Sequence, residues 1–310
     1  IRSLGEDPRA IYEALGYFPT EIHQTTCCTN EAMRFISQVE ADTDSAPFPW
    51  LMSINYFDPH PPWDPPQEYL DRYDPNSLPG PHYEESDIAA QELLHGVDFQ
   101  SEPRPPEEFA AREKQASYYA MIELIDHNVG RLLDFLDSKG LRENTIVIFT
   151  SDHGESLGDH GLLLKGCRFY EGLVRVPLLV SGPMWNAAQQ SEALVELTEL
   201  TPTLLEAAGL PALDGMVGHS LAPLLSGSAP LDHHRDSVRA EYYHTLNGSA
   251  PGRNFVGSYA TMIRDTKYKL VTYHGHEPGE LFDLDADPWE HTNLWNDNAY
   301  TDVRYRLMKE

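Results

Sequence analysis

The sequence predicts an α/β body followed by a small antiparallel subdomain. Three observations lead to this prediction. A helical apolar stripe over residues 112–138 leads into a short β-branched run at 145–150, which is the order of a β-α-β unit. After about residue 235 the pattern changes to alternating strands around short polar turns. We therefore expect a domain at 1–234, with a mostly parallel central sheet flanked by helices, and an antiparallel α+β subdomain at 235–310.

The first part of the chain predicts a strand and then a long irregular segment. The run WLMSINYF at 50–57 is apolar and β-rich, and the prolines of DPHPPW end it. Residues 58–110 are rich in Pro, Asp and Glu and show little periodicity. We therefore expect this segment to run over the surface with little order.

The middle of the chain predicts a long helix and a buried strand. Apolar residues recur at steps of three and four, at Tyr118, Met121, Ile122, Ile125, Val129, Leu132, Leu133 and Leu136. Gly140 then provides a stop signal. The run at 145–150 is apolar on both faces, which favours a central parallel strand.

Further elements are predicted toward the C-terminus. VRVPLLVSG at 174–182 favours a strand, and LTELTPTLLEAAGL favours a helix capped by Thr201 and ended by Gly209. SYATMIRD and TKYKLVTYH alternate around a short polar turn, as an antiparallel pair does. GELFDLDADPWEHTNL adds one more strand and a turn.

Charge and composition exclude several classes of partner. The 310 residues include 49 acidic and 22 basic side chains, and the formal net charge is −27. This charge repels nucleic acid and anionic membranes, so neither is an expected partner. The sequence contains no run of about 18 apolar residues, so it predicts no membrane span. The three cysteines predict neither a disulfide framework nor a zinc site. An anionic substrate would require a metal and a few basic groups to reverse the local field.

The stretch SDHGESLGDHGLLLK at 151–165 holds the candidate site. Asp152 and His153 follow directly after the predicted strand, and ligands bind beyond the carboxyl ends of strands in α/β sheets. A carboxylate and an imidazole can share one divalent cation. The simpler alternative is a helix cap and a surface histidine. Lys165, beyond a glycine-rich turn, and His60, after another strand, favour the functional interpretation.

The segment TIVIFTSDHGESLGDHGLLLKGCRFYEGLVRVPLLVSGP resembles the central signature of the type I sulfatase family. This family belongs to the alkaline-phosphatase superfamily and includes the related phosphonate monoester hydrolases. HQTTCCTNEAMRFI resembles the helix before the family's histidine loop, and NYFDPHPPWDPPQEYLDRY resembles that loop. GHSLAPLL and ELFDLDADPWEHTNL resemble the C-terminal markers. The resemblance implies an alkaline-phosphatase-like fold.

The resemblance also implies roles for individual residues. Asp152 and His153 match two metal ligands, with Ca²⁺ favoured and Mn²⁺ possible. Lys165 and His60 match a lysine and a histidine that contact the charged oxygens and the leaving group of the substrate. His160 is expected to line the pocket or to orient another group of the site.

One part of the family pattern is absent from this sequence. The nucleophile of the family is a formylglycine made from a Cys/Ser-x-Pro/Ala-x-Arg motif, which follows an Asp-Asp pair that supplies further metal ligands. Neither motif is present, and TNEAMRF after Cys27 and Cys28 does not match. The chain thus resembles the C-terminal two thirds of a sulfatase. We expect an N-terminal segment or a separate chain to complete it with the formylglycine.

The implied activity is hydrolysis of a sulfate monoester, with a sulfated carbohydrate favoured as substrate. Phosphonate or phosphate ester hydrolysis on the same fold is one alternative. A non-catalytic relative that binds sulfated glycans is another, from a different functional class. A periplasmic or secreted location is expected, with the cytoplasm as the alternative.

Overall fold

The computed structural model describes residues 16–41, 49–185, 188–244, 258–277 and 279–310. The chain divides into two compact units, one within Ile1–Gly80 and Phe109–Thr145 and the other within Pro81–Glu108 and Ile146–Glu310. Neither unit has a boundary at residue 234, so the predicted domain division there stays a prediction. None of the helices in the described ranges is long and apolar enough to cross a membrane.

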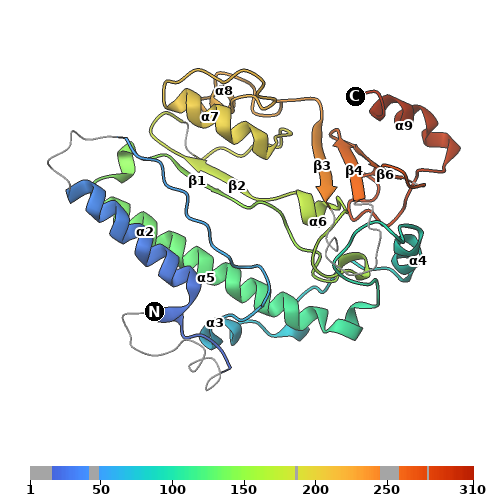
Figure 1. Cartoon of the computed structure of the whole chain (residues 1–310), viewed down its shortest axis with the longest axis horizontal. Coiled ribbons are helices and arrows are strands. Elements are labelled where there is room, and N and C mark those ends of the chain that lie inside the picture. Colours follow the sequence, from blue (N-terminus) through green and yellow to red (C-terminus); the bar gives the residue numbers. More distant parts are fainter. Residues whose placement is uncertain (1–15, 42–48, 186–187, 245–257, 278) are drawn as a thin grey trace. The chain divides into compact units, whose positions relative to one another are not determined.

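The first unit is helical and is organised around one long helix (Figure 1). Its helices are α2 (Gln24–Ala41), α3 (Gln67–Leu70) and α5 (Ala111–Ser138). Both α2 and α3 pack against α5. At the first of these contacts the buried Asn128 side chain of α5 donates to the Leu124 carbonyl (2.9 Å) and lies 3.5 Å from the Thr26 hydroxyl of α2.

The helix predicted at 112–138 is confirmed, and the predicted stripe is buried at Met121, Ile125 and Leu136 but not at Ile122. Gly140 follows the helix with φ +66°, a left-handed conformation that glycine adopts easily, so the predicted stop is also confirmed. Ile122 was expected inside and is 43% exposed. Ala120 and Leu124 instead pack against Tyr69 of α3. Alanine is too weakly apolar to mark a buried stripe, and this explains the error.

Two expectations for residues 50–110 are wrong. Residues 50–57 do not form a strand, because no described segment pairs with them and a strand needs a hydrogen-bonded neighbour. Residues 58–110 are ordered and contain α3 and α4 (Glu85–Leu93), with buried side chains such as Tyr69 and Leu94. Their prolines divide the segment into pieces too short to show a period.

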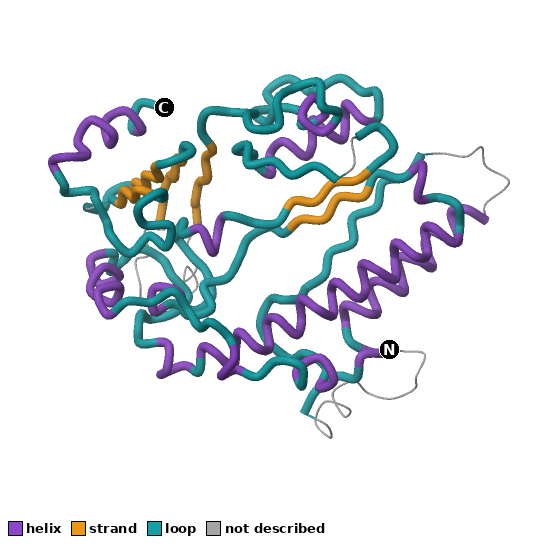
Figure 2. The backbone as a smooth tube through the Cα atoms, turned by 180° about the vertical axis from the view of Figure 1, so that it is seen from behind, coloured by secondary structure: helices purple, strands orange, loops and turns teal. Residues whose placement is uncertain are grey.

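The second unit contains the strand before the candidate site. β1 (Val147–Thr150) pairs with β2 (Leu178–Ser181) as a two-stranded ribbon (Figure 2). The pairing is antiparallel, which corrects the parallel direction expected for residues 145–150. An apolar run indicates burial but not direction. The chain passes from β1 through α6 (Glu171–Val174) to β2, which runs opposite to β1.

The C-terminal sheet of the second unit confirms the predicted hairpin. β3 (Val238–His244), β4 (Ser258–Arg264), β5 (Tyr268–Tyr273) and β6 (Glu280–Asp283) form an antiparallel sheet in the order β3-β4-β5-β6. Asp265 accepts hydrogen bonds from the N–H groups of Lys267 (2.7 Å) and Tyr268 (2.6 Å), which fixes the turn between β4 and β5. The unit also contains α8 (Ala222–Leu225) and α9 (Thr301–Leu307).

The helix predicted near residue 200 is confirmed with a different start. α7 (Leu200–Ala207) already includes Thr201, which therefore does not cap it. A 3₁₀ turn precedes the helix, and Glu196 and Glu199 form a reciprocal capping box there. Gly209 follows the helix with φ +69°, as expected for its stop.

Candidate functional site

The loop after β1 holds Asp152 and His153 in a defined conformation. The Ser151 hydroxyl donates to the His153 carbonyl (2.8 Å), and the His153 N–H donates to Asp152 Oδ1 (3.0 Å). Gly154 comes next, where an added Cβ would collide with the Gly172 carbonyl oxygen. The glycine of the SDHG motif is thus required by the close approach of two backbone segments.

The side chains of Asp152 and His153 fit part of a divalent-metal shell. They are 86% and 40% exposed, and Asp152 Oδ2 lies 3.7 Å from His153 Nε2. His153 Nδ1 lies 2.8 Å from the Gly154 carbonyl oxygen, which can only accept, so Nδ1 carries a proton. Nε2 of His153 and Oδ2 of Asp152 are thus the two atoms that can bind one cation shared by the pair.

Lys165 lies in the same unit and is half-buried beside two carboxylates. Burial lowers the pKa of the Lys165 ammonium, and the charges of Glu155 and Asp152 raise it in part. The Lys165 carbonyl accepts from the Gln100 N–H (3.2 Å), which fixes the backbone at this point. The structure thus brings Lys165 into the electrostatic neighbourhood of Asp152.

Glu155 is a residue of this neighbourhood that the sequence analysis missed. Its side chain is buried, and burial raises its pKa, while hydrogen bonds from backbone N–H groups, first that of Leu164, partly lower it. No sequence pattern distinguishes this carboxylate from the many exposed ones of the chain. Its place after the SDHG motif was the only available signal.

His60 belongs to the first compact unit, in a loop anchored by Asp58. The buried Asp58 carboxylate accepts hydrogen bonds from Gln24 (2.9 Å) and from Thr25, both at the start of α2. His60 Nδ1 lies 2.7 Å from the Pro61 carbonyl oxygen, which fixes the ring and leaves Nε2 for other partners. The expected meeting of His60 with the residues of the second unit stays a prediction.

The cysteines do not have the properties of a nucleophile. Cys27 and Cys28 lie on α2, and burial is the main cause that raises the pKa of Cys28. Burial raises the pKa of Cys167 to about 12. Thiols with raised pKa values hold little reactive thiolate at neutral pH, which agrees with leaving Cys28 and Cys167 out of the predicted site.

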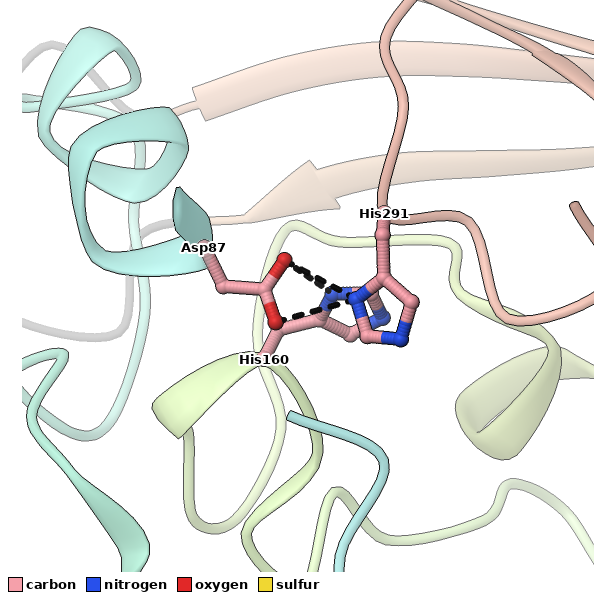
Figure 3. Close-up of side chains that lie close together, drawn as sticks. All are labelled: Asp87, His160 and His291. Carbon is pink, nitrogen blue, oxygen red and sulfur yellow. Dashed lines mark hydrogen bonds and ion pairs between the residues drawn. The ribbon is translucent and has the colours of Figure 1, made fainter. Parts of the chain in front are cut away.

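The histidine of the second Asp-His pair, His160, lies in a different setting (Figure 3). His160 is buried, stacks on Tyr170 with ring centroids 3.8 Å apart, and directs Nδ1 toward Asp87 Oδ1 at 3.5 Å. His291 Nδ1 lies 3.1 Å from both oxygens of the same carboxylate. Both expected roles of His160, lining the pocket and orienting another group of the site, stay predictions.

Asp87 links these two imidazoles, and sequence analysis did not find it. Burial alone would raise the pKa of the Asp87 carboxyl, but hydrogen bonds from His160, from the Glu84 backbone and from His291 together lower it. Asp87 and His291 are far apart in the sequence, so no local motif announces their contact.

A family model described as Sulfatase matches residues 13–210, which is more than half of the chain. The chain belongs to the sulfatase family. A second model, described as N-sulphoglucosamine sulphohydrolase, C-terminal, matches residues 158–310. These matches confirm the resemblance drawn from the SDHG stretch and the C-terminal markers.

Individual sulfatase relatives and a solved structure support the same conclusion. The chain is 30% identical to an arylsulfatase of Clostridium perfringens, over 94% of this chain and 59% of the relative. It is 31% identical to the multifunctional alkaline phosphatase superfamily protein PehA of Trinickia caryophylli, over 91% of this chain and 57% of the relative. The phosphonate monoester hydrolase of Agrobacterium radiobacter superposes with a TM-score of 0.79 at 28% identity, over 94% of this chain and 60% of that one.

These similarities confirm the alkaline-phosphatase-like fold class. The chain spans a little more than half the length of the three relatives named above. The activity of a complete protein of this family is therefore a proposal for this chain, whereas the fold class is shown.

Proposed function

We propose that this chain supplies the metal-binding loop and the leaving-group side of a sulfuric ester hydrolase. The observation that carries this proposal is the exposed pair Asp152 and His153, whose Oδ2 and Nε2 atoms lie 3.7 Å apart in the electrostatic neighbourhood of Lys165. The proposed substrate is a sulfate monoester of a carbohydrate. The proposed nucleophile is a formylglycine outside these 310 residues.

Asp152 Oδ2 and His153 Nε2 are the proposed metal ligands of this chain, with Ca²⁺ favoured over Mn²⁺. A bound divalent cation would supply positive charge for the sulfate oxygens and would lower the pKa of a coordinated hydroxyl group. The remaining ligands would come from outside the described residues.

Lys165 and His60 have complementary proposed roles. The partly desolvated Lys165 ammonium interacts strongly with the oxygens of a sulfuryl group, whose transition state spreads negative charge over them. His60 donates a proton from Nε2 to the departing ester oxygen, while Nδ1 stays bonded to the Pro61 carbonyl. The local positive charge of Lys165 and the metal offsets the net charge of −27.

The test is turnover of an aryl sulfate by the native protein, whose intact mass shows which polypeptides are present. Lys165→Ala should lower kcat/KM by about 100-fold or more, because a transition-state contact is lost. Lys309→Ala, at an exposed lysine near the C-terminus, is the matched control and should leave kcat/KM unchanged. Equal turnover by the two variants would refute the role of Lys165. Absence of turnover by a lone chain beginning at Ile1 would favour the non-catalytic, glycan-binding alternative.

Phosphonate ester hydrolysis is the second candidate, and the similarity to the Agrobacterium radiobacter phosphonate monoester hydrolase favours it. Sulfuryl and phosphoryl groups share their size and geometry, so the two activities need direct comparison. An aryl sulfate, a phosphonate ester and a phosphodiester should be assayed in parallel with Ca²⁺ and with Mn²⁺. We expect sulfate cleavage to be fastest, and faster phosphonate cleavage would replace the first proposal by the second.

A further inference from the structure

Asp87 and His160 are buried, His291 is partly buried, and the three form a cluster outside the proposed sulfatase metal ligands. One ligand atom of each lies within 4.8 Å of the others. Asp87 lies on α4, His160 in the 3₁₀ turn Asp159–Gly161 and His291 in the loop after β6, so three distant segments of the second unit meet here (Figure 3). All three side chains point toward one another rather than into solvent.

The distances within this cluster are not those of well-formed hydrogen bonds alone. His160 Nδ1 lies 3.5 Å from Asp87 Oδ1, which is longer than a good N–H···O hydrogen bond. His291 Nδ1 is 3.1 Å from both carboxylate oxygens, so its hydrogen bond is shared between the two. Metal bonds of about 2.0–2.1 Å at tetrahedral angles place neighbouring ligand atoms about 3.3 Å apart. The observed separations bracket that value.

Charge supports a cation at the same place. The Asp87 side chain is only 2% exposed, so the charge of its carboxylate is poorly hydrated. A divalent ion beside it would compensate this charge. The strongly acidic chain also concentrates cations around itself.

The donor set selects the kind of ion. Two imidazole nitrogens and one carboxylate suit Zn²⁺ and neighbouring transition metals, whereas Ca²⁺ prefers a shell of six to eight oxygens. We propose that Asp87, His160 and His291 bind one cation of the Zn²⁺ class. The ion ties α4 and the C-terminal loop to the turn that precedes Lys165. This site uses neither Asp152 nor His153, the proposed ligands of the sulfatase metal, so Co²⁺ binding tests it independently of the proposed function.

The test is a titration of the chelator-treated chain with Co²⁺, whose visible absorption reports tetrahedral coordination, followed by displacement with Zn²⁺. We expect one equivalent of Co²⁺ to give the tetrahedral spectrum, and Zn²⁺ to remove it. His291→Ala should weaken binding at least about 100-fold, since even residues that only support metal ligands contribute 10-fold to 100-fold. His276→Ala, at an exposed histidine, is the matched control and should bind as the unmodified chain does.

Several results would overturn the proposal. No stoichiometric binding by the unmodified chain would do so without any variant. The same holds if the spectrum survives in His291→Ala, or if it disappears in His153→Ala and not in His291→Ala. Should His291→Ala fail to fold, judged by circular dichroism, His291→Gln decides: retained affinity refutes the site and lost affinity supports it.

Discussion

Two Asp-His pairs of one short stretch have opposite surroundings. Asp152 and His153 expose 86% and 40% of their side chains, and their facing atoms meet only each other at 3.7 Å. In the second pair, Asp159 accepts the His82 N–H (2.7 Å) and the buried His160 faces Asp87. The same residue types therefore serve the fold in one place and remain available to a ligand in the other.

Lys269 and Lys165 show the same contrast between a side chain that is buried among partners and one that is partly exposed. Their substitution gives the largest expected difference in the free energy of unfolding. Lys269 is fully buried, with Nζ 2.7 Å from Glu171 and from Glu290 and 2.8 Å from the Phe169 carbonyl. Lys269→Met should lower the free energy of unfolding by about 3–5 kcal/mol, because the buried carboxylate of Glu290 and the partly buried one of Glu171 lose their partner. Lys165→Met should change it by less than about 1 kcal/mol, and in the stabilising direction. Urea denaturation of both variants measures the difference.

The effect of Lys165→Met should also depend on pH. Burial lowers the pKa of Lys165 in the folded chain, so the unfolded chain holds this proton more tightly. The cost of keeping the Lys165 ammonium charged in the folded chain is present at neutral pH. It disappears as the pH rises through the pKa of Lys165 in the folded chain and then in the unfolded chain, the latter about 10.4. The stability gap between the variant and the unmodified chain should narrow over that range. A loss of stability in Lys165→Met would show that Lys165 serves the fold.

Substitutions of Asp87 and Asp152 should differ in their effect on the free energy of unfolding, by less than the two lysine substitutions do. Asp87→Ala should lower the free energy of unfolding by about 2–3 kcal/mol, because the imidazoles of His160 and His291 lose a buried acceptor. Asp152→Ala should stay within about 0.5 kcal/mol, as is usual for an exposed side chain. Both are measured by chemical denaturation in a chelator, so that metal binding does not contribute. Similar losses in the two variants would remove the distinction between the pairs.

A pair of glycine substitutions gives the smallest expected effect. Gly154→Ala should cost about 1–3 kcal/mol, because the new methyl group would meet the Gly172 carbonyl and displace the backbone. Gly130→Ala, in the open middle of α5, is the matched control and should stabilise by about 0.5–1 kcal/mol. Thermal unfolding of both variants checks the signs. A neutral Gly154→Ala would mean that the loop of the first pair is not tightly seated.

Local patterns predicted the elements that depend on neighbours in the sequence. The helix at 112–138, its stop at Gly140 and the hairpin of β4 and β5 all follow from periodicity and turn chemistry within a few residues. The missing partner of residues 50–57 and the antiparallel direction of β1 depend on segments far along the chain. No local pattern contains that information.

Several predictions about the site stay open to experiment. They are the ligand roles of Asp152 and His153, the meeting of His60 with Lys165, the formylglycine in an N-terminal segment, and a periplasmic or secreted location. The turnover and variant measurements above test the first two. The sequence preceding Ile1 decides the third.

The sequence by itself determined the family and the residue types of the site, because the SDHG stretch, the histidine loop and the C-terminal markers occur in order along one chain. Only the tertiary structure decided which Asp-His pair is exposed. Burial depends on what packs against a residue, and here Asp87 and His291 come from distant segments to cover His160. The Asp152 side chain is 86% exposed, and within the described residues its hydrogen bonds are with its neighbours Ser151 and His153.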